Sequence, residues 1–164
     1  MAIQIDHIFE GPEATTAFGH SLARVLASGD LITLSGELGA GKSTLARGMI
    51  RHGLMDQGLP AEDIPSPTFT IVQSYPWPSS ADPGRELWHI DLWRIDDPEE
   101  LIELGFDEAL GRHIMVIEWP DRLGGLVPDD ALCLTLEAEE GGRRLTSGVL
   151  GPNWQARLAA AGLV

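Results

Sequence analysis

The stretch Gly36–Ser43, with the sequence GELGAGKS, decides the fold of this chain. It fits the pattern GxxxxGKS/T, a loop whose backbone N–H groups, lysine and hydroxyl converge on the phosphates of a nucleotide and its magnesium ion. The apolar run Leu31–Leu34 in front of it predicts a buried strand. Behind it, Ser43–Ile50 has apolar side chains at helical spacing, and Gly53 stands where a C-terminal cap is common. Strand, glycine loop and helix in this order predict binding of ATP or GTP.

The residue types of the loop suit this role. Gly36, Gly39 and Gly41 can adopt positive φ and let the main chain approach the phosphates. The start of the following helix adds unpaired N–H donors and a partial positive charge. Lys42 is predicted to supply a point charge to the β- and γ-phosphates, and the Ser43 hydroxyl is predicted to bind magnesium.

Length and composition predict one domain over residues 1–164. With 164 residues, 43% of them apolar, the chain can bury one good core. It contains no apolar run long enough to cross a membrane and no secretory signal at its N-terminus, so we expect a cytoplasmic protein without a membrane partner. The single cysteine, Cys133, excludes an internal disulfide framework, and its place in the strand-like run Ala131–Leu136 predicts a small buried thiol.

The net charge of −14 opposes direct binding of nucleic acid, because that affinity depends on lysine and arginine neutralising phosphates. We therefore expect no DNA partner, and any contact with RNA would need a partner protein or a local basic patch. The charge favours either a basic protein partner or an acidic, well-solvated surface that binds nothing.

The remaining pattern predicts an α/β fold, with a mixed sheet of about seven strands flanked by helices. No internal repeat or domain linker is visible, and Pro76–Gly84 is expected to be a surface loop. The expected strands cover Ile3–Ile5, Leu31–Leu34, Thr68–Tyr75, Leu87–Trp93, Ile114–Ile117, Ala131–Glu137 and Arg143–Val149. The expected helices are Ala14–Ala27, the loop helix, one that starts at Asp97–Glu100, and Asn153–Ala161.

Two carboxylates end apolar strands. Glu118 follows Ile114–Ile117 in the layout of a Walker B site, and Asp91 ends the second strand. The carboxyl ends of strands are where open α/β sheets gather their ligands, so we assign Glu118 to magnesium and Asp91 to the attacking water. The alternative for either acid is a helix N-cap or a loop ion pair. Trp119 can form a wall of the nucleotide site or pack in the core.

Three hydroxyls have two interpretations each. Thr44 is either a first-turn helix residue or a contact to a phosphate. Ser66 and Thr68 flank Pro67 at the point where many nucleotide-binding proteins keep a switch that senses the γ-phosphate, but a proline-stiffened turn has the same pattern. His89 is more simply a packed or hydrogen-bonded histidine than a ligand, and the other histidines show no metal-like spacing.

Four motifs in order make the chain resemble the TsaE (YjeE) family of P-loop proteins, over roughly Ala14–Val149. They are GELGAGKST at Gly36–Thr44, SPTFT at Ser66–Thr70, HIDLWR at His89–Arg94 with DPEEL at Asp97–Leu101, and VIEWP at Val116–Pro120. Trp93 and Phe69 replace tyrosines that are usual in the family, and both substitutions keep an aromatic ring.

The resemblance implies a P-loop NTPase fold and an ATPase of bacterial tRNA threonylcarbamoyladenosine synthesis. Its partners would be the TsaB and TsaD proteins, with tRNA contacted only through the complex. It also implies that Asp91 is needed for hydrolysis, that Glu118 binds magnesium beside Trp119, and that Thr15 contacts the nucleotide. Arg143 or Arg144 would approach the adenine. The loop residues implied to bind ATP are Leu38, Gly39, Ala40, Gly41, Lys42, Ser43 and Thr44.

Two other functions remain open from the residues alone. A small-metabolite kinase would share the loop and use Asp91 as a base, but it would need a lid with arginines, for which only Arg85 and Arg94 are candidates. A nucleotide-operated switch would use hydrolysis to reset its grip on a partner protein. The mechanism predicted for an ATPase is in-line attack of water on the γ-phosphate, with Lys42 and Mg²⁺ stabilising charge and Asp91 orienting the water.

Overall fold

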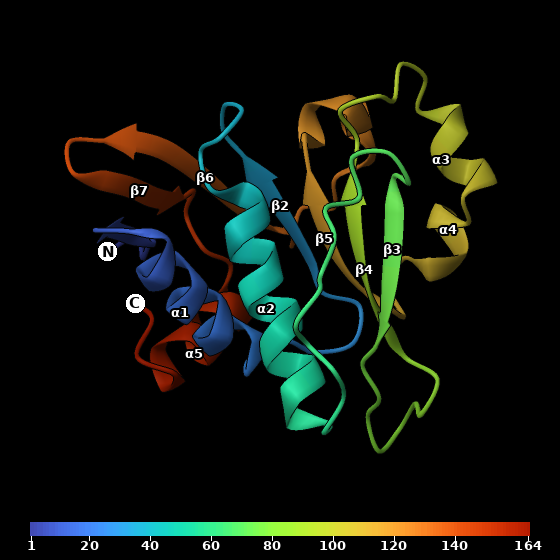
Figure 1. Ribbon diagram of the computed structural model, residues 1–164, viewed down its shortest axis with the longest axis horizontal. Coiled ribbons are helices and arrows are strands. Elements are labelled where there is room, and N and C mark those ends of the chain that lie inside the picture. Colours follow the sequence, from blue (N-terminus) through green and yellow to red (C-terminus); the bar gives the residue numbers. More distant parts are fainter.

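The computed structural model describes residues 1–164 and contains one seven-stranded sheet in the order β1-β7-β6-β2-β5-β4-β3 (Figure 1). The strands are β1 (Asp6–Phe9), β2 (Leu31–Ser35), β3 (Val72–Pro76), β4 (Glu86–Asp91), β5 (Ile114–Glu118), β6 (Leu132–Glu139) and β7 (Gly142–Ser147). The helices are α1 (Pro12–Ala23), α2 (Lys42–Asp56), α3 (Glu99–Glu103), α4 (Phe106–Ala109) and α5 (Pro152–Ala160), with a 3-10 segment η1 (Pro120–Leu126).

The sheet is mixed, as predicted, because its centre is parallel and its edges are not. The four central strands β6, β2, β5 and β4 run parallel to one another. At the edges, β3 pairs antiparallel with β4, β7 with β6, and β1 with β7. The central strand β2 therefore delivers the glycine loop at the same edge of the sheet as the carboxyl ends of β5 and β4.

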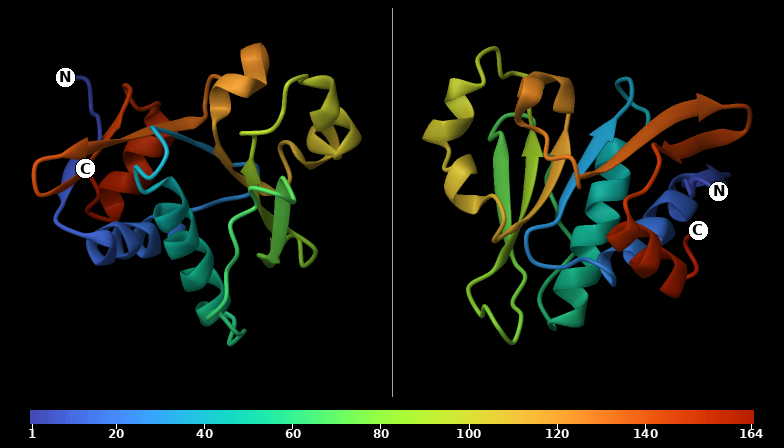
Figure 2. Two further views of the ribbon diagram at one scale, coloured as in Figure 1. Left: turned by 45° about the horizontal axis from the view of Figure 1, so that its top comes forward. Right: turned by 180° about the vertical axis from the view of Figure 1, so that it is seen from behind.

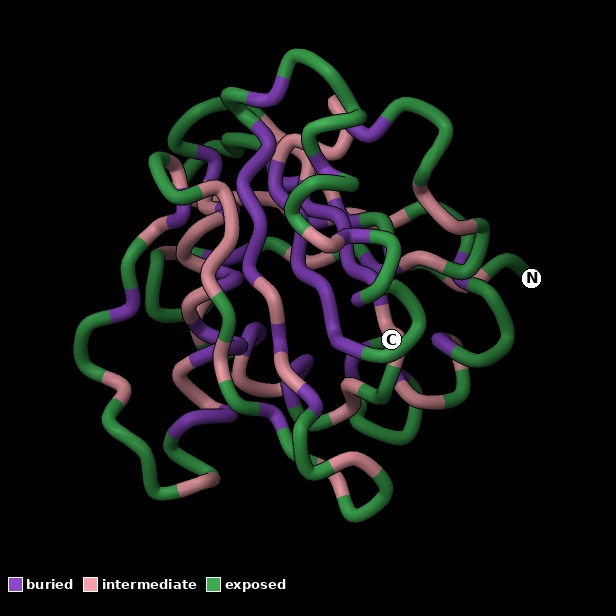
Figure 3. Tube along the Cα trace, turned by 90° about the vertical axis from the view of Figure 1, so that its right-hand side faces the viewer, coloured by how far each residue is buried: buried purple, intermediate pink, exposed green.

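Two apolar cores lie on the two faces of the sheet. Helices α1, α2 and α5 lie over one face, and together with that face of the sheet they form a core cluster of 26 buried residues. On the other face α3, α4 and η1 cover a smaller cluster of 10. The two groups of helices stay apart when the molecule is turned (Figure 2). Figure 3 shows that burial is concentrated along the strands between them.

The alternation of side chains along the strands places the acids on the α2 face. In β5, Ile114 and Val116 join the larger core, and Met115 and Ile117 join the smaller one. Because strand side chains alternate between faces, Glu118 follows Val116 onto the α2 side. By the same period, His89 and Asp91 of β4 follow Leu87, which is also part of the larger core.

Helix α2 is held close to α1 by two glycines. A Cβ atom added at Gly48 would lie 2.7 Å from the carbonyl oxygen of Thr16, and one added at Gly19 would lie 2.7 Å from that of Leu45. Both are backbone contacts, so a larger residue at either position would push the helices apart. This close packing fixes the helix that begins at the nucleotide loop.

Two expected strands start later in the structure than the pattern indicated. Residues Thr68–Thr70 form a turn, and β3 begins only at Val72, because Ile71 adopts φ 66° and breaks the extended backbone between them. At the N-terminus, the ladder of β1 covers only Asp6–Phe9. The carbonyl of Ile5 accepts from the N–H of Ser147 at the end of β7, and the carbonyl of Ile3 accepts from the N–H of Leu150 beyond it.

The prediction that Gly53 caps the loop helix is wrong, because α2 continues to Asp56. Gly58, just beyond the C-cap Gln57, has the positive φ of 70° that is typical after a helix, and the N–H of Leu59 donates to the carbonyl of Leu54. Gly53 is required for a different reason: a Cβ atom there would collide with the ring of Trp77.

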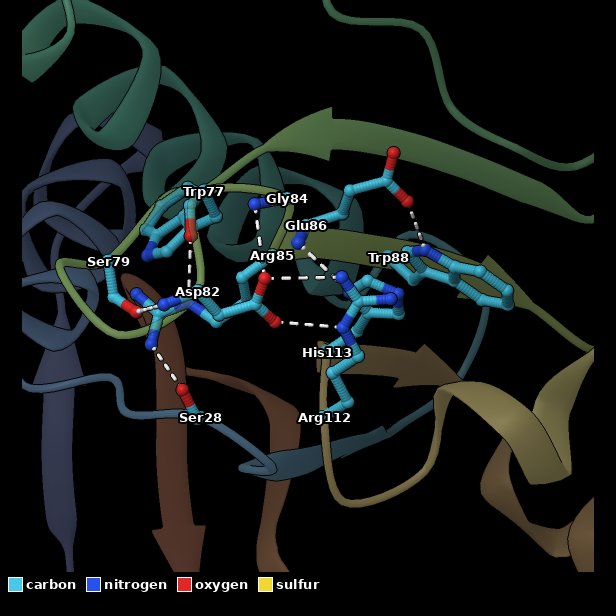
Figure 4. A network of polar contacts seen from close by, with 10 residues as sticks. All are labelled: Ser28, Trp77, Ser79, Asp82, Gly84, Arg85, Glu86, Trp88, Arg112 and His113. Carbon is cyan, nitrogen blue, oxygen red and sulfur yellow. Dashed lines mark hydrogen bonds and ion pairs between the residues drawn. The ribbon is translucent and has the colours of Figure 1, made fainter.

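The Pro76–Gly84 loop is held by side chains on several elements. Trp77 is buried against α2, and Arg85 donates to the Trp77 carbonyl at 2.7 Å and to Ser28 at 2.8 Å (Figure 4). Asp82 accepts two hydrogen bonds from Arg112, at 2.8 and 3.1 Å. This expected surface loop is thus attached to α2 through Trp77 and to the segment before β5 through the contact of Asp82 with Arg112.

Cys133 is exposed, so the prediction of a buried thiol is wrong. The strand itself is present, but Leu132 and Leu134 take the positions that face the larger core, and Cys133 points to the opposite face. No helix of the structure combines the length and the apolar character of a membrane span.

Gly48→Ala is expected to destabilise the protein even though alanine favours helix formation by about 1 kcal/mol. Overpacking against the Thr16 carbonyl costs about 1–3 kcal/mol and outweighs that gain. Urea unfolding measures the difference. Gly148→Ala is the control, because a Cβ atom there meets nothing within 4 Å. Equal stability of the two variants would contradict the close approach of α1 and α2.

Candidate nucleotide-binding site

The glycine loop connects β2 to α2 in a backbone conformation that residues with a Cβ atom would rarely adopt. Gly36 has φ 142°, and a Cβ atom there would collide with the carbonyl oxygen of Leu136. Gly41 has φ 107° and occupies the N-cap of α2, which starts at Lys42. The first N–H groups of α2 therefore face the loop, as an anion-binding helix start requires.

A pocket of about 240 Å³ lies between this loop and the ends of β4 and β5. Its walls come from four segments that are distant in the sequence: the loop with the first turn of α2, the turn before β3, the carboxyl end of β4 and the carboxyl end of β5. The lining residues are Leu38, Gly39, Gly41, Lys42, Ser43, Thr44, Thr68, Asp91, Trp93, Glu118 and Trp119. The structure thus gathers most of the residues that the sequence selected.

Three of the selected residues lie outside this pocket. Ala40 lines a neighbouring hollow on the other side of the loop. Ser66 contacts the pocket only through Thr68, since its Oγ is 3.0 Å from the Thr68 Oγ1. Thr15 is buried in α1, where its hydroxyl donates to the Gly11 carbonyl at 3.5 Å.

Glu118 is the buried centre of the pocket, with only 2% of its surface exposed. The Ser43 hydroxyl lies 3.0 Å from Oε1 and 3.2 Å from Oε2 of this carboxylate. The imidazole Nε2 of His89 lies 2.7 Å from Oε2. The first turn of α2 and the strand β4 therefore both hold the acid that ends β5.

Asp91 lies beside Glu118, since the two residues are partners in the β4–β5 register. Its Oδ1 accepts a hydrogen bond from the backbone N–H of Trp93 at 2.9 Å, and its Oδ2 accepts one from the Thr68 hydroxyl at 3.3 Å. Asp91 is thereby connected to the turn that the sequence selected as a switch. The contact joins Ser66, Thr68 and Asp91 in one chain of hydrogen bonds.

Lys42 folds over the loop and reaches an aromatic wall. Its Nζ donates to the carbonyls of Gly36 at 2.7 Å and of Glu37 at 2.8 Å, and it lies 4.2 Å from the ring centroid of Trp119. Burial lowers the pKa of this lysine, and the charges of the two nearby carboxylates oppose that shift. The Trp119 ring also contacts Trp93, with centroids 4.4 Å apart, so Trp119 forms a wall of the pocket.

The donors in the pocket suit Mg²⁺ that is also held by phosphates. A serine hydroxyl and a carboxylate supply oxygen ligands, which Mg²⁺ prefers, and Mg²⁺ usually binds one or two protein groups together with substrate phosphates and waters. The chain has no group of three His, Cys, Asp or Glu side chains that could hold a metal by themselves. Ser43 and Glu118 therefore fit a magnesium ion that arrives with a nucleotide.

The neighbouring hollow, of about 410 Å³, extends from the loop to strands β6 and β7. Its lining includes only one of the two arginines, Arg143 and Arg144, between which the sequence could not decide. Arg143 lines it and donates to the Gly39 carbonyl at 3.2 Å, whereas Arg144 forms a paired contact with Asp6 at 2.9 and 2.8 Å. Arg143 is the one beside the loop.

Sequence reasoning missed two features of the site. The contact of His89 with Glu118 was not predicted, although His89 precedes Asp91 by two positions and so shares its face of β4. The second feature is an exposed aromatic ring directly after Thr68. Phe69 is 78% exposed, with the Arg94 guanidinium 4.5 Å from its ring centroid.

Comparison with known proteins gives the family of this chain. The model of the family described as "Threonylcarbamoyl adenosine biosynthesis protein TsaE" matches residues 9–145. The chain belongs to the TsaE family. Proteins named as the tRNA threonylcarbamoyladenosine biosynthesis protein TsaE are similar to it in Streptomyces coelicolor, with 36% identity over 83% of this chain and 90% of the relative, and in Rickettsia conorii, with 33% identity over 86% and 75%.

A relative of the same name in Bacillus subtilis is 32% identical over 88% of this chain and 85% of its own. A crystal structure of YdiB from Bacillus subtilis superposes with a TM-score of 0.73 and 26% identity, covering 99% of this chain and 96% of the other. The TsaE resemblance predicted from the four motifs and the predicted α/β fold are both confirmed.

Thr68→Val is expected to loosen the turn that connects to Asp91. The variant keeps the shape of the side chain but removes the donor to the carboxylate, so amide hydrogen exchange at Phe69–Ile71 should accelerate. Thr70→Val is the matched control, because the only side-chain hydrogen bond of its hydroxyl is a solvent-exposed one that it accepts from Gln73. Equal exchange in both variants would show that Asp91 does not hold this turn.

Proposed function

We propose that this TsaE-family protein is a Mg²⁺-dependent ATPase that acts with the TsaB and TsaD proteins in forming N6-threonylcarbamoyladenosine on tRNA. One observation carries the proposal: the loop hydroxyl of Ser43 contacts the buried carboxylate of Glu118, with Lys42 and Asp91 in the same pocket. A cytoplasmic location and an indirect contact with tRNA, through the partner proteins, are part of the proposal.

The residues have separate tasks in this mechanism. Bound Mg²⁺ would neutralise charge on the β- and γ-phosphates, with Ser43 and Glu118 as its protein ligands. Lys42 turns from the loop carbonyls toward the γ-phosphate, where its positive charge stabilises the transition state. Asp91 accepts a hydrogen bond from water and orients it for in-line attack. The backbone N–H of Trp93 and the Thr68 hydroxyl keep that carboxylate in place.

The hollow beside the loop offers room for the base of a nucleotide. It continues from the loop glycines to the exposed Ala138 on β6, and Arg143 is among its lining residues. Thr15 stays a candidate for nucleotide contact on the family resemblance alone, because its hydroxyl now faces the Gly11 carbonyl.

The structure disfavours a metabolite kinase. Such an enzyme needs arginines that face the donor phosphates, and Arg85 lies in the network of the Pro76–Gly84 loop, where it donates to Trp77 and Ser28 (Figure 4). Arg94 contacts the Phe69 ring. A nucleotide-operated switch shares the ATPase site, and the link between Thr68 and Asp91 gives that reading a physical basis.

Phosphate release from ATP, by the protein alone and with TsaB and TsaD, tests the proposal. We expect stimulation by the partners, and a loss of about 10²-fold or more in Lys42→Ala and Asp91→Asn, because each removes a group that acts in the transition state. Asp82→Asn is the control, since this acid pairs with Arg112 away from the pocket. Full turnover in Asp91→Asn would refute the role of Asp91, and transfer of phosphate to a metabolite from cell extract would favour a kinase.

Glu118→Gln is expected to weaken nucleotide binding mainly when Mg²⁺ is present. The amide keeps the size of the side chain but loses the charge that attracts the ion, so the gain in ATP affinity on adding Mg²⁺ should shrink about tenfold or more. Calorimetric titration of ATP with and without Mg²⁺ measures this increase in affinity. If Mg²⁺ increased the affinity of Glu118→Gln as much as that of the wild type, Glu118 would not be a magnesium ligand.

A further inference from the structure

His89 is a buried histidine whose one polar contact is the proposed magnesium ligand. It is 0% exposed, and its Nε2 lies 2.7 Å from Oε2 of Glu118. It does not line the pocket, whereas Asp91, two residues later on the same face of β4, does. His89 therefore lies beneath the pocket and can affect a ligand only through Glu118.

The heavy-atom contacts of His89 indicate which nitrogen of the neutral imidazole carries the proton. The Nδ1 atom is buried and has no partner. A neutral imidazole has one N–H and one acceptor nitrogen, so with the proton on Nε2 it donates to the carboxylate, and no N–H is left without an acceptor. A proton on Nδ1 would create a buried unpaired donor and leave two acceptors facing each other, which is costly.

This donor acts on one oxygen of the carboxylate. Oε2 accepts from His89 at 2.7 Å and lies 3.2 Å from Ser43, whereas Oε1 has only the Ser43 contact, at 3.0 Å. Oε1 is the oxygen with more free acceptor capacity. A carboxylate held in this way meets a metal with one oxygen, directly or through water.

We propose that His89 is a positioning residue that holds Glu118 to single-oxygen coordination and so makes the site select Mg²⁺ over Ca²⁺. Mg²⁺ keeps octahedral geometry with one-oxygen carboxylate contacts, whereas Ca²⁺ takes six to eight ligands and accepts carboxylates through both oxygens. Release of Oε2 would let Glu118 rotate and offer both oxygens. The inference rests on the proposed magnesium site, and it goes further by assigning the metal preference to a residue that touches neither metal nor nucleotide.

The substitutions His89→Gln and His89→Asn separate the effect of losing the hydrogen-bond donor from the effect of losing the imidazole ring. Glutamine places its amide nitrogen near the position of Nε2, and asparagine places its own near Nδ1, too short to reach Glu118. His113→Asn is the matched control. It is also a buried histidine beside β5, but its Nδ1 accepts from the Glu86 N–H and its ring stacks on Trp88 (Figure 4).

The experiment is calorimetric titration of wild type and the three variants with a non-hydrolysable ATP analogue, in Mg²⁺, in Ca²⁺ and in EDTA. We expect His89→Asn to lower the analogue's affinity in Mg²⁺ about tenfold and to leave its affinity in Ca²⁺ nearly unchanged, the size usual for loss of a hydrogen bond to a metal ligand. His89→Gln and His113→Asn should keep the wild-type Mg²⁺/Ca²⁺ ratio. Thermal unfolding checks that each variant is folded.

A wild-type ratio in His89→Asn, or an equal loss in His89→Gln and His89→Asn, would overturn this inference alone. If the wild-type protein bound the ATP analogue with the same affinity in Mg²⁺, in Ca²⁺ and in EDTA, both the proposed function and this inference would be overturned. A long-range ¹H–¹⁵N spectrum of the wild-type protein tests the tautomer without any variant: a proton on Nε2 supports the assignment, and a proton on Nδ1 contradicts it.

Discussion

The structure depends most on the buried carboxylate of Glu118. An acid with 2% exposure is stable only with hydrogen-bond partners, and here the partners come from two different elements: Ser43 at the start of α2 and His89 in β4. The carboxylate thus connects the nucleotide loop to the sheet. Any change that moves α2 relative to β5 must break one of these contacts, which couples the packing of the larger core to the geometry of the pocket.

The pocket is also bordered by two unusual backbone conformations. Trp119, directly after Glu118, has φ 59°, and Ile71, whose carbonyl accepts the N–H of Asp91, has φ 66°. Residues other than glycine pay about 1–3 kcal/mol for such conformations, which persist only where the surroundings hold them. Each stands next to one of the two acids. The strained backbone at Trp119 directs its ring toward Lys42. The strained backbone at Ile71 ends the turn that contains Thr68.

Much of this arrangement is local enough to be predicted from the sequence. The glycine loop, its flanking strand and helix, and the acids that end β4 and β5 follow from residue type and spacing, and the parallel centre of the sheet then brings them to one edge. Packing between distant segments could not be predicted. Gly53 looked like a helix cap because nothing in the sequence shows that Trp77 lies against it.

The same limit applies within the site. The strand pattern at Thr68–Tyr75 is interrupted by one backbone angle at Ile71, which no composition reveals. Cys133 lies in the predicted strand, but its side chain is on the face opposite the larger core and is exposed, which the apolar run of the strand does not reveal. The proposed role of His89 depends on a side-chain contact between two strands. The register pairs Glu118 with Asp91, and His89, two residues earlier on the same face of β4, reaches Glu118 with its imidazole.

The central claim is that the loop, Glu118 and Asp91 form one site for MgATP. A crystal structure of the protein with Mg²⁺ and a non-hydrolysable ATP analogue tests this claim most directly. The account predicts a triphosphate along Gly36–Ser43, a metal ion in contact with Ser43 and close to Glu118, and a water beside Asp91. A nucleotide bound elsewhere, or a metal ion that approaches neither Ser43 nor Glu118, would contradict it.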